Sequence, residues 1–160
     1  MKYFMTRSGA DRLRAQTVIL EAKLRAVLKE KGVAADVGGN VWHDNFAFEQ
    51  ASRDEAMLSK QLHDMRQLLR GATIVDPPID PDRVVLGCKV EIEIDGAARK
   101  QVVVGGYLES DPDRGIVSYD SPLGKALLGS RPGDVRTYAV AGRDITVEIF
   151  SLAGSSRESD

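Results

Sequence analysis

Carboxylates gather in one stretch of this 160-residue chain with almost no compensating base. Between residues 34 and 55 there is a single base, Arg53, against five acids: Asp36, Asp44, Glu49, Asp54 and Glu55. Carboxylate oxygens are the ligands that Mg²⁺ prefers, and one or two of them suffice when the ion keeps several waters. A charge cluster of this kind is also the ordinary composition of a solvated loop, so both interpretations stay open.

Histidine and cysteine give weaker evidence for a catalytic or metal site than these acids do. His43 precedes Asp44, which would suit a general base or a zinc ligand, but the only other histidine is His63, about five helical turns away at 3.6 residues per turn. A surface histidine is therefore the favoured interpretation. Cys88 is the only cysteine, which excludes a disulfide framework within the chain and favours buried packing. Gly105-Gly106 lacks the third glycine of a dinucleotide loop and predicts a bulge or a close backbone contact.

Charge is divided unevenly along the chain. Residues 1–75 hold 12 Lys and Arg against 9 Asp and Glu, whereas the rest holds 10 against 15, which gives the net charge of −2. An acidic second half disfavours direct DNA binding. No apolar run approaches the roughly 18 residues that a membrane span needs, so we expect no membrane insertion and a cytoplasmic location.

Two helices are predicted to position the acidic cluster. Heptad-like spacing marks one apolar seam at Leu13, Thr17, Leu20, Leu24 and Val27, and a second at Phe48, Ala51, Glu55, Leu58, Leu62, Met65 and Leu69. The first helix is expected to begin at a Thr6 or Ser8 cap and to end at Lys31-Gly32, and the second to end at Arg70-Gly71. Two narrow seams joined by a short turn predict an antiparallel hairpin about 35–40 Å long at about 1.5 Å per residue.

The acids then lie at the far end of this hairpin, and the bases Arg12, Arg14, Arg66 and Arg70 near its start. We assign residues 1–75 to the hairpin, with its tip at 33–45. Pro77, Pro78 and Pro81 predict a linker over residues 76–83.

Residues 84–153 change to a period of two, typical of strands, and 154–160 form a tail. Val90, Ile92 and Ile94 alternate with charged neighbours in a half-buried strand, and four more strands are expected after it. One short helix is predicted after Ser121 as N-cap and Pro122 at the first helical position. The fold class is therefore α+β: a helical hairpin followed by a small α+β domain.

The chain resembles the GreA/GreB family of transcript cleavage factors in several segments: MTRSGADRLRAQ, DNFAFEQASRDEAML, GATIVD, VVLGCKVEIE, VVVGGYLESDPDRGIVSYDSPLGKALLG and RPGD. Their order and spacing across both predicted domains carry the resemblance. It implies a coiled-coil hairpin and an FKBP-like C-terminal domain that docks at the secondary channel of bacterial RNA polymerase, near the largest subunit. It also implies that Asp120, Ser121 and Pro122 belong to the docking surface, although Ser121-Pro122 is equally a plain helix start.

The resemblance further implies that the tip reaches the polymerase active centre and the RNA 3′ end, where a Mg²⁺ shared with the polymerase assists cleavage. The family places two acids three residues apart there. In this chain Asp44-Asn45 takes the place of the family's Glu-Asn, whereas Asn40 stands where the first acid is expected. Trp42 and His43 lengthen the segment. The only catalytic candidate is Asp44, a possible Mg²⁺ ligand, with Asp36, Asn40, Trp42 and Glu49 as further channel contacts.

Three interpretations of the tip stay open. The tip retains cleavage through Asp44 with help from Asp36 or Glu49; or it occupies the channel and modulates elongation, pausing or initiation without cutting; or it is only a solvated acidic loop. In none of them is the chain itself an enzyme, and no cofactor of its own is expected.

Other classes fit less well. A prolyl isomerase needs an aromatic-lined apolar pocket, and the second half has no Trp and only scattered aromatic residues. A multimeric coiled coil is disfavoured by Thr17 and Glu55 in the seams, so a monomer is expected.

Overall fold

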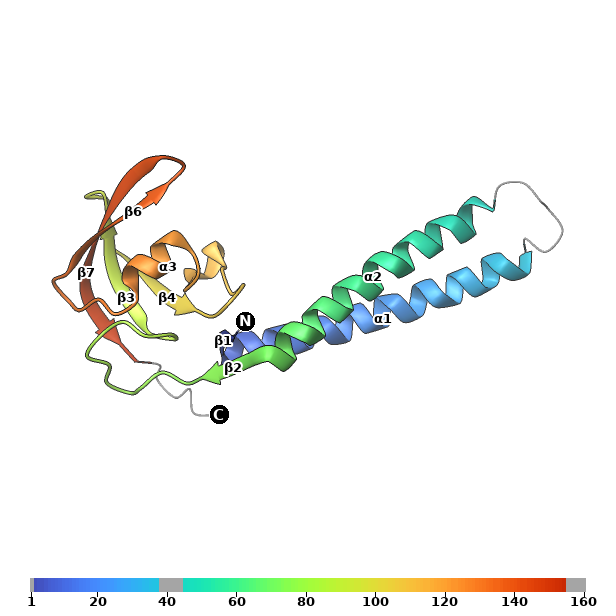
Figure 1. Ribbon diagram of the computed structural model, residues 1–160, viewed down its shortest axis with the longest axis horizontal. Helices are drawn as coiled ribbons and strands as arrows, with labels where there is room; N and C mark the ends of the chain where they lie inside the picture. Colours follow the sequence, from blue (N-terminus) through green and yellow to red (C-terminus); the bar gives the residue numbers. More distant parts are fainter. Residues whose placement is uncertain (1, 38–44, 155–160) are drawn as a thin grey trace. The chain divides into compact units, whose positions relative to one another are not determined.

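The computed structural model describes residues 2–37 and 45–154 (Figure 1). The chain forms two compact units: Asp11–Gly71 make one, and the described residues up to Ala10 and from Ala72 onward make the other. The predicted fold class, a helical hairpin followed by a small α+β domain, is confirmed. Neither long helix is apolar enough, within the described residues, to cross a membrane.

The helical unit is an antiparallel pair of helices lying side by side (Figure 1). Helix α1 spans Arg7–Val37 and α2 spans Phe46–Gly71. Two ion pairs show the antiparallel direction, since Glu21 near one end of the pair meets Arg66 at 2.6 Å and Lys31 further along meets Glu55 at 2.6 Å. The predicted seams face each other, with these seam residues buried: Thr17, Ala51, Leu58 and Leu62.

The polar residues in the seams are satisfied. The Thr17 hydroxyl donates to the Leu13 carbonyl at 2.8 Å, within its own helix. Glu55 accepts from the Lys31 ammonium, which also lies 5.3 Å from the centre of the Phe48 ring. A seam with such residues is narrower than an all-apolar one, which suits a helix that needs a single partner.

The predicted end of the first helix at Gly32 is wrong. Helix α1 continues to Val37, so residues 33–37 of the predicted tip are helical. A glycine inside a helix costs only about 1 kcal/mol relative to alanine. The Lys31–Glu55 ion pair and the contact of Ala34 with Asn45 on either side of Gly32 offset that cost. The second helix ends at Gly71 as predicted.

At the other end of α1, Thr6 rather than Ser8 is the cap. Its hydroxyl accepts a hydrogen bond from the Gly9 amide at 3.0 Å, which satisfies one of the free donors of the first turn. Ser8 lies 3.2 Å from the same hydroxyl. One of the two predicted caps is therefore confirmed.

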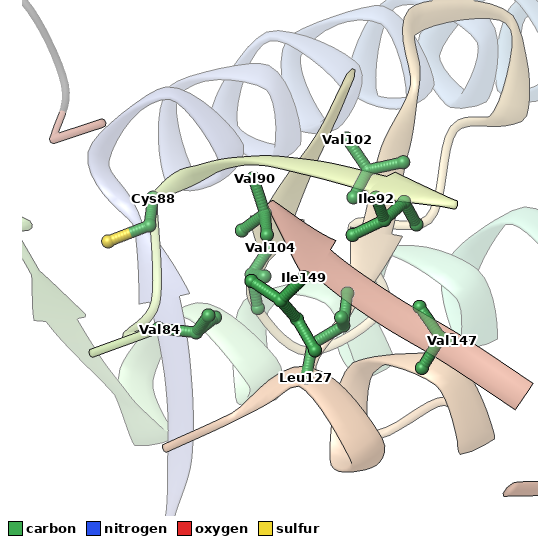
Figure 2. Close-up of a cluster of buried hydrophobic side chains, with 9 residues drawn as sticks. All are labelled: Val84, Cys88, Val90, Ile92, Val102, Val104, Leu127, Val147 and Ile149. Atoms are coloured by element: carbon green, nitrogen blue, oxygen red, sulfur yellow. The ribbon is translucent and has the colours of Figure 1, made fainter. Parts of the chain in front are cut away.

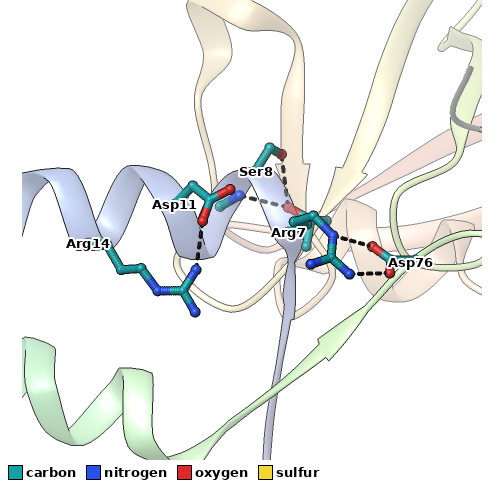
Figure 3. A network of polar contacts seen from close by, with 7 residues as sticks. Arg7, Ser8, Asp11, Arg14 and Asp76 are labelled. Atoms are coloured by element: carbon teal, nitrogen blue, oxygen red, sulfur yellow. Dashed lines mark hydrogen bonds and ion pairs between the residues drawn. The ribbon is translucent and has the colours of Figure 1, made fainter. Parts of the chain in front are cut away.

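A short parallel pairing precedes α1 and follows α2. Strand β1, Tyr3–Thr6, pairs with β2, Ala72–Val75, from Tyr3 opposite Ala72 to Thr6 opposite Val75. Sequence analysis placed residues 72–75 in the hairpin, but they form this strand. Next to the pairing, Arg7 binds Asp76 through two hydrogen bonds of 3.1 and 2.6 Å (Figure 3). The hydrogen bond from Arg7 lowers the pKa of Asp76, aided by the Arg7 charge and opposed by desolvation.

Residues 76–83 contain no helix or strand, as expected of the predicted linker. They nevertheless lie against the α+β domain. Pro77 packs on Gly87, whose φ of +86° suits glycine, and an added Cβ there would lie 2.8 Å from the proline ring. Gly154 makes a similarly close approach to the backbone of Pro78 and Ile79.

The α+β domain is a five-stranded sheet in the order β5-β4-β3-β7-β6. Its strands are β3 Lys89–Ile94, β4 Lys100–Gly105, β5 Ile116–Ser118, β6 Val135–Val140 and β7 Arg143–Ala153. All neighbours are antiparallel except β4 and β5, which are parallel. The 3₁₀ turn Pro112–Arg114 precedes β5, and helix α3, Pro122–Leu127, follows it.

The core of this domain lies between the sheet and α3 (Figure 2). The predicted alternation is confirmed, since Val90 and Ile92 are fully buried. Cys88 is also fully buried, and burial raises the pKa of its thiol, an effect that a hydrogen bond with the Val85 backbone partly offsets. The thiolate that reacts with thiol reagents is therefore disfavoured in the folded domain.

Two adjacent leucines at the end of α3 allow a matched test of this core. Leu127 is fully buried and Leu128 is 37% exposed. We expect Leu127→Ala to lower the free energy of unfolding by about 2–5 kcal/mol because it leaves a cavity. We expect Leu128→Ala to change it by only about 0.5 kcal/mol. Pulse labelling of Cys88 with a thiol reagent across a urea series measures unfolding of this domain alone. Equal losses in the two variants would show that α3 does not complete the core.

Candidate functional site

The predicted tip residues are only partly within the described chain. Asn40, Trp42 and Asp44 lie outside the described residues, and their roles stay predictions. Asp36 is exposed in the last turn of α1, and Glu49 is exposed in the first turn of α2.

The described acids differ in what they bind. Glu49 forms an ion pair with Arg53 at 3.5 Å, Asp54 accepts from the Gln50 amide at 2.9 Å, and Glu55 is held by Lys31. Asp36 makes no hydrogen bond or ion pair with another described residue. Of the four described acids, Asp36 is therefore the one without a partner among the described residues.

A metal ion would find an incomplete set of ligands here. Among residues 2–37 and 45–154 there is no group of three or more His, Cys, Asp or Glu side chains that could hold one. An exposed carboxylate such as that of Asp36 would fit a Mg²⁺ that another molecule already binds, because such an ion needs only one or two further carboxylates. When bound there, Mg²⁺ would activate water for hydrolysis.

Asn45 organises the start of α2, directly after Asp44 in the sequence. Its Oδ1 accepts a hydrogen bond from the Phe48 amide at 3.1 Å, which makes it the N-cap. Its Nδ2 donates to the Ala34 carbonyl of α1 at 2.7 Å. One side chain thus caps one helix and joins it to the other. The sequence analysis matched Asn45 to the family motif but gave it no role, although Asn before a helical run is a capping signal.

Asp120, Ser121 and Pro122 lie together at the start of α3. The Ser121 hydroxyl accepts from the Gly124 amide at 3.0 Å and donates to the Ser118 carbonyl at 2.7 Å, so the predicted N-cap is confirmed. Asp120 and Pro122 are exposed, and Asp120 forms an ion pair with Lys125 at 3.1 Å. The exposed groups of this segment are therefore Asp120 and Pro122, whereas the Ser121 hydroxyl is engaged within the turn.

A residue that sequence analysis missed supports this turn. Ser118 is 7% exposed, and its hydroxyl donates to the Gly106 carbonyl at 2.9 Å. The Tyr119 amide donates to the Gly105 carbonyl at 2.9 Å. Gly105-Gly106, predicted as a bulge or close contact, is a close contact, since a Cβ on Gly106 would lie 2.6 Å from the Met5 Cα. No local signal marks Ser118, because its partner is 12 residues away.

The hairpin also carries a concave feature between its two helices. A shallow groove of about 310 Å³ is lined by side chains of both helices: Leu24, Ser59, Leu62, His63, Arg66, Gln67 and Arg70. His63 is exposed and lies 3.5 Å from the Gln67 amide, in accord with a surface histidine. Its lining combines the apolar side chains of Leu24 and Leu62 with Arg66 and Arg70, two of the bases predicted near the start of the hairpin.

Comparisons with known proteins agree with this architecture. Residues 79–153 match the family model described as "Transcription elongation factor, GreA/GreB, C-term". Transcription elongation factor GreA of Thermomicrobium roseum is 32% identical over 133 residues, which cover 82% of this chain and 84% of that protein. Transcription elongation factor GreA of Oceanobacillus iheyensis is 30% identical over 153 residues, covering 94% and 96%.

Among solved structures, the crystal structure of GreA factor homolog 1 (Gfh1) protein of Thermus thermophilus covers 96% of this chain and 100% of its own, at 24% identity and a TM-score of 0.45. The two GreA relatives and the matched C-terminal domain define the class, a Gre-type transcription factor. The chain belongs to the GreA/GreB family of transcription elongation factors.

The double role of Asn45 predicts a graded response to substitution. Asn45→Ala removes the cap and should destabilise the first turn of α2 by about 1 kcal/mol. Asn45→Asp keeps the accepting oxygen and loses only the bond to Ala34, so the Phe48 amide should stay protected. Hydrogen exchange at Phe48 measures the difference. Exchange that is equally fast in both variants would contradict the capping role.

Proposed function

We propose that this protein binds bacterial RNA polymerase at the secondary channel and modulates elongation, pausing or initiation through its hairpin tip, with weak or no stimulation of transcript cleavage. It acts in the cytoplasm as a monomeric accessory factor rather than as an enzyme. Membership of the GreA/GreB family supports the choice of polymerase as partner.

The proposal of weak or absent cleavage rests on how few acids are present at the tip. Asn40 stands where the family resemblance places the first acid of a pair, and a neutral amide is a poor anchor for Mg²⁺. The nearby described acids Glu49, Asp54 and Glu55 already make an ion pair or a hydrogen bond on the hairpin itself, which supports this view. Only Asp36 and Asp44 remain, and they are eight positions apart in the sequence.

The alternative is a factor that stimulates endonucleolytic cleavage of backtracked RNA by the polymerase. Asp36, which makes no hydrogen bond or ion pair with another described residue, favours this alternative, because with Asp44 it would restore two acids. In that case the pair would help to hold the second Mg²⁺ of the polymerase active centre near the RNA 3′ end.

A stalled, backtracked elongation complex distinguishes the two functions. With Mg²⁺ present, we expect the protein to slow nucleotide addition and to release no more short 3′ RNA fragments than the polymerase alone. Asp44→Ala should weaken the slowing, because it alters the tip. Asp54→Asn is the matched control and should act like the unchanged protein, since Gln50 already engages that carboxylate. Fragments that appear with the unchanged protein and vanish with Asp44→Ala would establish the cleaving alternative.

Docking is proposed to involve the exposed groups of Asp120 and Pro122 at the start of α3. Asp120→Asn and Pro122→Ala alter these groups without removing the Ser121 cap, so they should reduce affinity for core polymerase about 5- to 30-fold, the range of an interface contact worth about 1–2 kcal/mol. Asp113→Asn changes an exposed acid of the 3₁₀ turn and should bind normally. A binding titration with labelled factor measures the affinities. Unchanged affinity in both docking variants would remove this segment from the interface.

A further inference from the structure

Glu109 is the only charged residue that is buried in the described part of the chain, with 6% of its surface exposed. Its carboxylate receives two hydrogen bonds from one residue. The Thr6 amide donates to one oxygen at 2.8 Å, and the Thr6 hydroxyl donates to the other at 2.6 Å. A charge removed from water is costly unless it is compensated in this way, so its position requires an explanation.

The carboxylate lies at the N-terminus of α1. Thr6 is the N-cap of that helix, and its hydroxyl links Glu109 to the Gly9 amide by donating to the first and accepting from the second. The free amides of a first helical turn carry partial positive charge, which favours a carboxylate nearby. Glu109 thus extends the cap of α1 by one more side chain, and it comes from more than 100 residues along the chain.

Two glycines make room for this contact. A Cβ added to Gly9 would collide with the Glu109 carboxylate, and one added to Gly106 would collide with the carboxylate and with the backbone of Phe4. Gly9 is inside α1, where alanine would otherwise be the more favourable residue.

The same loop supports the proposed docking segment. The Tyr107 amide donates to the Phe4 carbonyl at 2.8 Å, and the Gly106 carbonyl accepts from the buried Ser118 hydroxyl. Phe4 also meets the Tyr119 ring edge-on, with 6.3 Å between the ring centres. All of these residues belong to one compact unit, and α1 runs on from its capped first turn without a break to Val37.

We propose that Glu109 is a positioning residue that fastens the first turn of α1 to the loop beneath Asp120–Pro122, so that a docked domain keeps the start of the hairpin ordered. This inference rests on the proposed function, because it assigns Glu109 to delivery of the tip. Loss of the Glu109–Thr6 contact is expected to leave the docking surface intact. It should weaken the effect of the tip on nucleotide addition once the factor is bound.

The contact itself is tested without polymerase. Thr6→Val removes the hydroxyl that accepts from the Gly9 amide, and Glu109→Gln removes the charge that orients this hydroxyl, so each should speed hydrogen exchange at the Gly9 amide by up to about tenfold, the factor expected for one lost hydrogen bond. The double variant should be little worse than either single one, because both remove one shared interaction. Thr6→Ser keeps the hydroxyl and should restore protection. Additive effects, or unchanged exchange, would overturn the contact.

Gly9→Ala gives an independent check of opposite sign. Helix propensity alone predicts that alanine protects the first turn, whereas a methyl group that displaces Glu109 must expose it. We expect faster exchange at the first-turn amides. Slower exchange would show that Glu109 does not occupy this space.

The positioning role is tested on the elongation complex. Glu109→Gln should bind core polymerase with an affinity within about twofold of the unchanged protein, while its maximal effect on nucleotide addition at saturation falls about threefold or more, the pattern of a change in turnover rather than in binding. Glu91→Gln is the matched control, since that half-buried carboxylate bonds Ser151 at 3.2 Å on the sheet.

The outcomes separate the two proposals. An unchanged protein that does not bind polymerase removes the proposed function, while the exchange data still decide the contact. An active unchanged protein with a Glu109→Gln variant of equal maximal effect removes the positioning role alone. A variant whose affinity falls with its effect would place Glu109 in docking instead, and would equally overturn the proposal.

Discussion

The pairing of β1 with β2 is the constraint on which the rest of the fold depends. Four residues on each side bring together the two ends of a hairpin whose helices begin directly after β1 and end directly before β2. Closing a loop of this length has an entropic cost that grows only slowly with loop length. A short strand pairing can therefore compensate for this cost when side-chain contacts add to its stability. The ion pair of Arg7 with Asp76 adds to it next to the last backbone pair.

This closure also explains why polar residues concentrate around Thr6. Thr6, the last residue of β1, pairs with Val75 and also caps α1, and its amide donates a hydrogen bond to Glu109. An unpaired amide in such a buried position would cost more than a typical hydrogen bond gains. The buried glutamate is therefore a consequence of joining a strand to a helix with no intervening loop.

Local rules were sufficient for much of the fold. The seams, the Ser121 cap and the alternation of Val90 and Ile92 each follow from spacing within a few residues, and each is confirmed. The end of α1 was misjudged at Gly32, because the contacts on either side of this glycine come from Glu55 of the other helix and from Asn45, further along the chain. Strand β2 was missed because its partner lies nearly 70 residues away, and nothing in the letters ATIV distinguishes a strand from the end of a coiled coil.

In the candidate site, too, local signals in the sequence were sufficient for some features and not for others. The sequence identified the acidic cluster, but it could not show which acids bind neighbouring side chains. Asp54 accepts a hydrogen bond from Gln50, and Glu49 forms an ion pair with Arg53. The sequence likewise identified Ser121 without showing that the turn uses its hydroxyl. The described candidates that present exposed groups are Asp36 at the tip and Asp120 and Pro122 at the docking segment, and Asp120 also pairs with Lys125. Ser121, Asn45 and Glu109 act one step behind them, by fixing the backbone from which those groups project.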